Sequence, residues 1–366
     1  MPTIQEIISS LEAVAPLAYQ ESYDNAGLLV GDVSQEANAA LLTLDITEEV
    51  IDEAIQRGCN LIVCHHPLIF GGLKKITGAN LVERCVIKAI QNNIAIYASH
   101  TNMDSVYGGV NDKICEKLQL KNCKILSPAN NQLQKLVFFV PSAQAEEVRK
   151  SVFEAGAGHI GNYDSCSFNT NGQGTFRGQE GANPFVGNVG EVHTEEEVKV
   201  ETIVPKHLTG KVLAALMTAH PYEEVAYDIY PLNNQLNSVG IGMIGELETE
   251  MEELDFLRTV KETFGCPSIK YTALKNKPVK KVAVCGGAGS FLLKAAIGNK
   301  ADVFISGDFK YHDYFSAEGR VVIADIGHYE SEQFTKEVFY EILRKKFPKF
   351  ALHLSEVITN PVNYLI

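Results

Sequence analysis

The chain has 366 residues, of which 45% are hydrophobic, and a formal net charge of −13. This length exceeds one ordinary domain and predicts two or three, with ample apolar material for a core. The acidic charge argues against nucleic acid as a partner, because broad binding needs a basic face. No apolar run approaches the roughly 18 residues that span a membrane, so no membrane partner is expected.

The cysteines point to a reducing compartment. The eight of them are scattered and form no Cys-x-x-Cys pair. Cys64, Cys85 and Cys285 fall within apolar runs, as buried free thiols do. The N-terminal residues lack the basic and apolar regions of a secretion signal. We therefore expect a cytoplasmic protein.

The first third of the chain alternates between helices and strands. Apolar residues at helical spacing predict a helix over residues 3–14. Thr47, followed by two glutamates, predicts the N-cap of a second helix that ends at Gly58. Alternation of this kind favours a parallel sheet covered by helices on both faces. The remaining expected elements are strands at 40–44, 61–64 and 94–98 and a helix at 80–92.

The middle of the chain follows another pattern. Residues 127–131 and 233–235 have the composition of linkers. Two β-α-β units lie between them, which is typical of a ferredoxin-like α+β domain. We predict that residues 128–235 form such a domain, inserted into an α/β core of residues 1–127 and 236–366. Its expected elements are strands at 135–140, 165–169, 199–204 and 225–230 and helices at 145–155 and 208–219.

The last third repeats the α/β pattern. Expected strands cover residues 281–285, 302–306 and 321–324, the glycine-rich turn 286–290 leads into a helix, and a long helix covers 331–347. In both halves a histidine follows the matching strand and a carboxylate comes four residues later, as His100 with Asp104 and His328 with Glu332. We predict two similar α/β lobes that face each other, so that their polar strand ends converge.

Two adjacent histidines, His65 and His66, directly follow the apolar strand 61–64. Neighbouring side chains on a regular strand point to opposite faces. At a strand end, with Pro67 favouring an extended His66, both rings can enter one cleft. Metal ligation and simple hydrogen bonding at a strand end are about equally expected from this pair alone.

A second candidate corner contains His328 and Glu332. If the helix begins at Ser331, Glu332 lies in its first turn, where a carboxylate also favours the helix dipole. Asp104 is either a further ligand or an N-cap. Nitrogen and carboxylate ligands of this kind suit a pair of metal ions and hydrolytic or phosphoryl chemistry. The candidate metal ligands are His65, His66, Asp104, His328 and Glu332.

Three further residues are candidates for proton transfer. His100 is either a ligand or a residue that orients one, and we favour the orienting role. Asp308 and His312 follow the strand 302–306 and are either acid/base or substrate-binding groups or ordinary loop residues. The glycine-containing segments 71–75 and 286–290 either bind an anion or form plain turns.

Several spaced segments resemble the GTP cyclohydrolase 1 type 2 homologue family, also called the Nif-three-like family. They are residues 22–31, 64–67, 99–104 and 327–332. The resemblance covers residues 1–127 and 236–366. Residues 174–177, 180–185 and 220–228 resemble the insert of the longer bacterial members, which is similar to the trimeric copper-tolerance and nitrogen-regulator-like ferredoxin folds.

The resemblance implies a dinuclear metal site with Glu332 as its bridging ligand. By motif match the ligands are His65, His66, Asp104, His328 and Glu332. It also implies a toroidal homohexamer whose metal sites face an inner cavity. Mixed nitrogen and oxygen ligation suits two divalent ions of Zn, Fe or Mn.

We therefore expect a metal-dependent hydrolase, GTP cyclohydrolase-like by resemblance, that acts on a nucleotide-like or phosphorylated small molecule. The alternative is a non-catalytic metal-binding or regulatory scaffold whose insert senses a ligand. Five protein ligands for two ions leave positions open, which favours catalysis. Fold and site do not fix the substrate.

Overall fold

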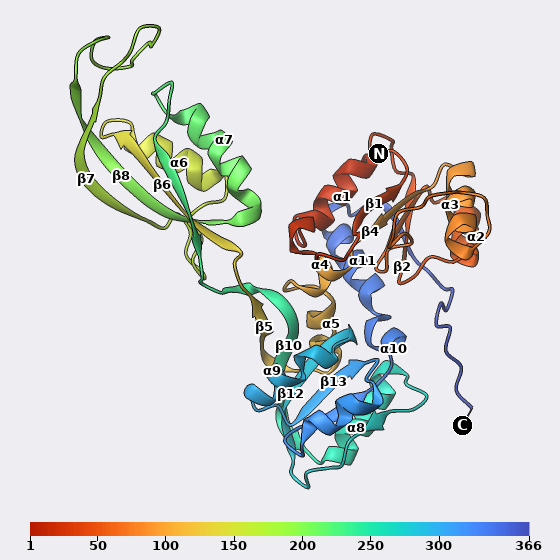
Figure 1. Ribbon diagram of the computed structural model, residues 1–366. Coiled ribbons are helices and arrows are strands. Elements are labelled where there is room, and N and C mark those ends of the chain that lie inside the picture. Colours follow the sequence, from red (N-terminus) through yellow and green to blue (C-terminus); the bar gives the residue numbers. More distant parts are fainter. Residues whose placement is uncertain (366) are drawn as a thin grey trace. The chain divides into compact units, whose positions relative to one another are not determined.

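The structure is a computed structural model that describes residues 1–365, and its architecture is mixed α/β (Figure 1). The chain divides into two compact units. The larger comprises Met1–Pro128 and the segment from Asn237 onward, and the smaller comprises Ala129–Leu236. No helix within residues 1–365 is long and apolar enough to cross a membrane.

A five-stranded sheet forms the first part of the larger unit, in the order β1-β4-β3-β2-β15. Strands β2, β3, β4 and β15 run parallel, and β1 is antiparallel to β4. Every residue of β3 and β4 is buried, as expected for parallel strands covered on both faces. The strands are β1 (Gly27–Val30), β2 (Ala39–Thr43), β3 (Leu61–Cys64), β4 (Ala95–Ala98) and β15 (Ala351–Leu354).

Helices cover both faces of this sheet. On one face, α1 (Ile4–Glu12) and α11 (Thr335–Lys346) share a core cluster with Val63. On the other, α2 (Glu48–Gln56) and α3 (Leu81–Gln91) share a cluster with Ile62. The Thr47 side chain accepts a hydrogen bond from the Val50 backbone, so the predicted N-cap of α2 is confirmed.

A six-stranded sheet forms the second part of the larger unit, in the order β11-β14-β13-β12-β10-β5. Its central strands β12, β13 and β14 are parallel, whereas β10 and β11 are antiparallel to their neighbours β12 and β14. The strands are β5 (Lys121–Ala129), β10 (Leu236–Met251), β11 (Lys270–Tyr271), β12 (Val279–Ala288), β13 (Val303–Gly307) and β14 (Val322–Asp325). The remaining helices of the larger unit are α4 (Thr101–Asp104), α5 (Val110–Lys117), α8 (Glu253–Phe264), α9 (Leu293–Gly298) and α10 (His328–Glu332).

The smaller unit is an antiparallel sheet with two helices. The strand order is β7-β8-β6-β9, and each strand pairs antiparallel with its neighbours. Helices α6 and α7 contribute to a core cluster with Phe138 and Val200. The elements are β6 (Leu133–Pro141), α6 (Ala145–Glu154), β7 (Ser167–Phe176), β8 (His193–Pro205), α7 (Thr209–Ala219) and β9 (Tyr227–Leu232).

Three local predictions are wrong. Residues 127–129, expected in a linker, belong to β5, an edge strand where Pro128 is tolerated. The glycine segment 286–290 is not a turn directly into a helix, because β12 runs to Ala288 and a 3-10 helix (Ser290–Leu292) precedes α9. The long helix 331–347 is two helices, α10 and α11. The Thr335 hydroxyl donates to the Glu332 carbonyl at this break, which competes with helical bonding.

Candidate metal centre

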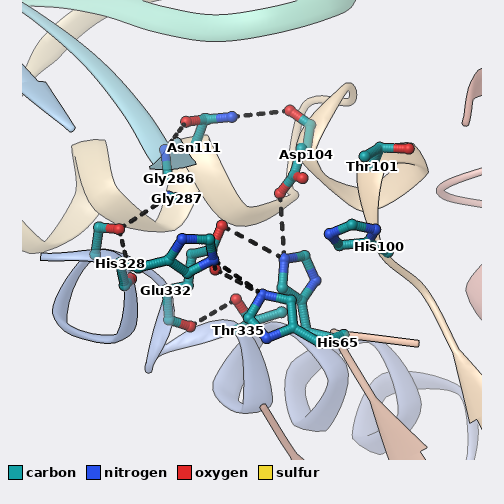
Figure 2. A network of polar contacts seen from close by, with 12 residues as sticks. His65, His100, Thr101, Asp104, Asn111, Gly286, Gly287, His328, Glu332 and Thr335 are labelled. Atoms are coloured by element: carbon teal, nitrogen blue, oxygen red, sulfur yellow. Dashed lines mark hydrogen bonds and ion pairs between the residues drawn. The ribbon is translucent and has the colours of Figure 1, made fainter. Parts of the chain in front are cut away.

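The predicted ligands come together where β3, β4 and β14 end (Figure 2). His65 and His66 follow β3, and both of their backbone N–H groups donate to the Leu44 carbonyl. The regular ladder therefore stops at His65, and the two rings lie side by side with centroids 4.9 Å apart. Both rings therefore contribute to one group of possible ligand atoms, together with His100.

Helix α10 begins at His328, not at Ser331 as the sequence suggested. His328 and Glu332 are therefore four residues apart on one helix face, and His328 Nε2 lies 3.1 Å from Glu332 Oε2. Asp104 ends α4 and does not cap the following helix, whose N-cap is Gly109. The alternative of Asp104 as an N-cap is thus wrong.

The first group of ligand atoms surrounds His65. Its Nδ1 donates to the Ser99 carbonyl at 2.9 Å, which leaves the lone pair of the neutral ring on Nε2. That Nε2 lies 3.6 Å from Asp104 Oδ1 and 3.7 Å from Glu332 Oε1. Both His65 Nε2 and Asp104 Oδ1 are buried without a hydrogen-bond partner. Such atoms are costly unless something pairs with them, and a cation among them would do so.

The second group surrounds the other oxygen of Glu332. His66 Nε2 lies 2.9 Å from Glu332 Oε2, and the His66 and His328 Nε2 atoms are 3.3 Å apart. Ligand atoms within each group lie within 4.8 Å of one another. The residues present therefore fit a metal ion in each group, with Glu332 common to both.

Three of the histidines contact a carboxylate through their Nδ1 atoms. Carboxylates in this position fix the tautomer and orientation of a metal-binding ring. Asp24 and Asp45 were not among the sequence-based candidates, and Asp308 was considered there only as an acid/base or substrate group. Asp45 could have been found, because it lies just beyond β2 as His65 lies just beyond β3. The Nδ1-to-carboxylate distances are 2.6 Å for His66–Asp45, 2.7 Å for His328–Asp308 and 2.8 Å for His100–Asp24.

The three proton-transfer candidates have different positions. The His100 ring belongs to a third group of possible ligands, with His65 and His66. Asp308 directly follows β13, and its carboxylate is half-exposed. His312 is exposed in a 3-10 helix, in ring contact with Tyr311. Within residues 1–365 no hydrogen bond or ion pair joins His312 to the cluster.

The electrostatics of the cluster favour bound cations or protons. Burial alone would lower the pKa of His66, but hydrogen bonds to Asp45 and Glu332 raise it to about 10. Burial alone would also lower the pKa of His328, but the hydrogen bonds that its ring donates to Glu332 and Asp308 raise it to about 9. Burial, then the charge of Glu332, raises the pKa of Asp104 to about 8. Protons and metal ions therefore compete for the same ligand atoms.

Glu332 itself stays ionised. Burial would raise its pKa, but hydrogen bonds from His328 and His66 lower it well below the usual value. Gly287, at φ +61°, packs against this carboxylate, and a Cβ there would lie 2.4 Å from Glu332 Oε1. The site therefore has a fixed anionic centre.

A cavity of about 460 Å³ adjoins the cluster. His66 and His328 form part of its wall, so a small molecule in it would reach the candidate metal ligands. Other lining residues include Asp45, Ser268, Lys270, Asp308, Asp325, Tyr329, Glu330 and Asn360. The glycine segment 71–75 is largely exposed and is absent from the residues that line this cavity.

Comparison with known proteins places the chain in a family. Residues 2–361 match the model of Duf34/NIF3 (NGG1p interacting factor 3). A relative from Halalkalibacterium halodurans, named GTP cyclohydrolase 1 type 2 homolog, is 39% identical over 99% of this chain and 98% of its own length. A relative of the same name from Bacillus subtilis is 38% identical over the same shares.

The crystal structure of a Bacillus cereus protein related to NIF3 is 41% identical to this chain. The match covers 100% of this chain and 99% of that one, with a TM-score of 0.86. The chain therefore belongs to the Duf34/NIF3 family.

Proposed function

We propose that the chain is a hydrolase that depends on two divalent ions, of Zn, Fe or Mn, held by His65, His66, Asp104, His328 and Glu332. The observation that supports this most is that the two carboxylate oxygens of Glu332 approach different ligand groups. Its Oε1 lies 3.7 Å from His65 Nε2, and its Oε2 lies 2.9 Å from His66 Nε2. One carboxylate whose oxygens approach different ligand groups is the arrangement of a bridging ligand.

When bound, such ions supply Lewis-acid chemistry, which polarises a carbonyl or phosphoryl group and acidifies water. The protein's part is to hold the ligand rings and to move protons. Asp45 and Asp308 fix the orientation of His66 and His328 through their Nδ1 atoms. His100, held by Asp24, is our candidate for proton transfer beside the ions, with Asp308 and His312 as further candidates.

The cavity supports a small-molecule substrate. Its walls include Lys270, which pairs with the buried Asp325 at 2.7 Å, and the half-exposed Asp308. We propose a nucleotide-like or phosphorylated compound. The name of the relatives makes GTP the first compound to test, but a name does not establish the reaction.

Two further proposals concern the smaller unit and the assembly of the chain. We propose that it is a ferredoxin-like domain inserted into a two-lobed core, because its strand order β9-β6-β8-β7 and its two helices have that topology. We also propose a toroidal homohexamer, as the family resemblance implies, and a cytoplasmic location, for which the free cysteines are the support. Light scattering of the purified full chain tests the assembly.

The enzymatic proposal is tested with metal-reconstituted full chain against GTP, other nucleotides and phosphodiesters. His66→Ala and Glu332→Ala should abolish turnover while the oligomer survives. His159→Ala is the control, because His159 is exposed in the smaller unit. If fully metal-loaded protein turns over no compound, the chain is better described as the alternative, a metal-binding or regulatory scaffold.

A further inference from the structure

The smaller unit contains a second cavity, of about 760 Å³, unrelated to the metal cluster. It lies on the sheet face that α6 and α7 leave open. Phe138 and Val200 point into the core beneath those helices, so their neighbours Phe139 and Lys199, paired across β6 and β8, point to the other face. The loops around residues 177–185 and 222–226 complete the cavity wall.

A buried carboxylate lies in the wall of this cavity. Glu197 is only 8% exposed. Its Oε1 accepts a hydrogen bond from the Tyr222 hydroxyl at 2.9 Å, but within residues 1–365 its Oε2 has no hydrogen bond and its side chain no ion pair. The nearby Lys199 pairs instead with Glu201 at 2.8 Å. Glu197 Oε2 is not among the fully buried atoms that lack a partner, so it is open to the cavity, where N–H donors or a cation can reach it.

The neighbouring strand leaves room for the carboxylate itself. Gly174 of β7 faces the carboxylate, and a Cβ there would lie 2.2 Å from Glu197 Oε2. Any larger residue at this position would displace the carboxylate or fill the space beside it. The glycine keeps the carboxylate where it is while the cavity stays open.

Aromatic rings form the rest of the wall. The Tyr222 ring lies 5.8 Å from that of Phe176 and 6.3 Å from that of Phe185, centroid to centroid. Phe139 also lines the cavity. Aromatic faces attract organic cations, most strongly where water is excluded. Three acidic lining residues (Glu197, Glu223, Glu224) outnumber two basic ones (Arg177, Lys199), which adds to the preference for a cation.

We propose that this cavity binds a small organic cation with N–H donors, of the amidinium or guanidinium type. Its planar head would donate to Glu197, and its body would lie against Phe176, Phe185 and Tyr222. A planar pair of N–H donors matches the two oxygens of a carboxylate, and a charge-assisted pair is stronger than a neutral one. The site is independent of the hydrolase proposal, because none of its residues belongs to the metal cluster.

The test uses full-length protein and benzamidine, a planar amidinium on an aromatic ring, with titration calorimetry as the readout. Benzamide has nearly the same shape without the charge and is the matched ligand control. We expect benzamidine to bind at millimolar concentration or below, and benzamide to bind about tenfold or more weakly. Glu197→Gln should weaken benzamidine binding by about 10- to 100-fold.

Two further variants separate binding from folding. Glu196→Gln changes the exposed neighbour of Glu197 and should bind benzamidine as the unmodified chain does. Gly174→Ala keeps Glu197, but its methyl group would lie 2.2 Å from Oε2 and force the carboxylate to move, so this variant should also lose binding. Circular dichroism and metal content should stay unchanged in every variant. The proposal is overturned if benzamidine does not bind, if benzamide binds equally well, or if folded Glu197→Gln retains full affinity.

Discussion

Replacing Gly287 by alanine should weaken metal binding while the chain still folds. Gly287 has φ +61°, and an added Cβ would lie 2.4 Å from Glu332 Oε1 and 3.2 Å from His328 Cε1. A separation of 2.4 Å is too short for a real contact, so the Glu332 carboxylate must move. If Glu332 bridges two ions, this movement affects both ligand groups.

The effect of Gly287→Ala on stability can be separated from its effect on metal affinity. A left-handed φ costs a residue with a Cβ about 1 kcal/mol, which lowers the melting temperature of a unit this large by about 2–4 °C. Displacing a metal ligand should cost at least the roughly 10- to 100-fold in affinity that the loss of an outer hydrogen-bond partner costs. Gly265 has φ +62°, and a Cβ added there would have nothing within 4 Å, so Gly265→Ala carries the first cost alone.

The assay is metal content per chain after dialysis against a graded series of chelator concentrations, together with thermal unfolding. Gly265→Ala should melt slightly lower and keep its metal. Gly287→Ala should melt lower and lose metal at about 10- to 100-fold less chelator. Metal retention by Gly287→Ala equal to that of Gly265→Ala would refute the reasoning that the position of Glu332 Oε1 controls metal binding.

Three other predictions test the surroundings of the cluster. Asp45→Asn should weaken metal binding about 10- to 100-fold, because Asp45 orients His66, whereas the exposed Asp52→Asn should not; chelator competition measures both. Metal affinity should rise with pH between about 6 and 8, because His66, His328 and Asp104, with pKa values near 10, 9 and 8, must give up protons that metal replaces. Calorimetry in buffers of different ionisation enthalpy should then show proton release, and an affinity independent of pH would contradict this. Asn111→Ala should destabilise the chain by about 2 kcal/mol in urea unfolding, because the buried Asn111 side chain binds the Gly286 N–H and the Asp104 carbonyl, and an unchanged unfolding midpoint would contradict that role.

The buried parallel strands can be predicted closely from sequence. The expected strand 61–64 has the bounds of β3, because a short apolar run between polar residues has one interpretation in an α/β pattern. Strand β10 has no counterpart among the expected elements. Its apolar residues Val239, Ile241 and Met243 alternate with glycines, and glycines close together favour the prediction of a turn or loop over a strand. Close backbone packing of this kind is visible only in three dimensions.

The ligand candidates are also visible in the sequence, whereas their supports are not. His65, His66 and Glu332 stand out because histidines and a carboxylate follow apolar strands. Asp24 lies in an irregular segment before β1, and only the fold brings it within 2.8 Å of His100. The role of Asp308 depends on a contact with His328 across 20 residues, which no local pattern encodes.

The central claim is that Glu332 joins two metal ions, and anomalous X-ray diffraction at the metal absorption edge tests it most directly. A crystal of the metal-loaded chain should show two anomalous peaks per chain, each about 2.0–2.2 Å from a different oxygen of Glu332. His65 and Asp104 should contact one ion, and His66 and His328 the other. A single peak, or two peaks of which neither contacts Glu332, would contradict the claim.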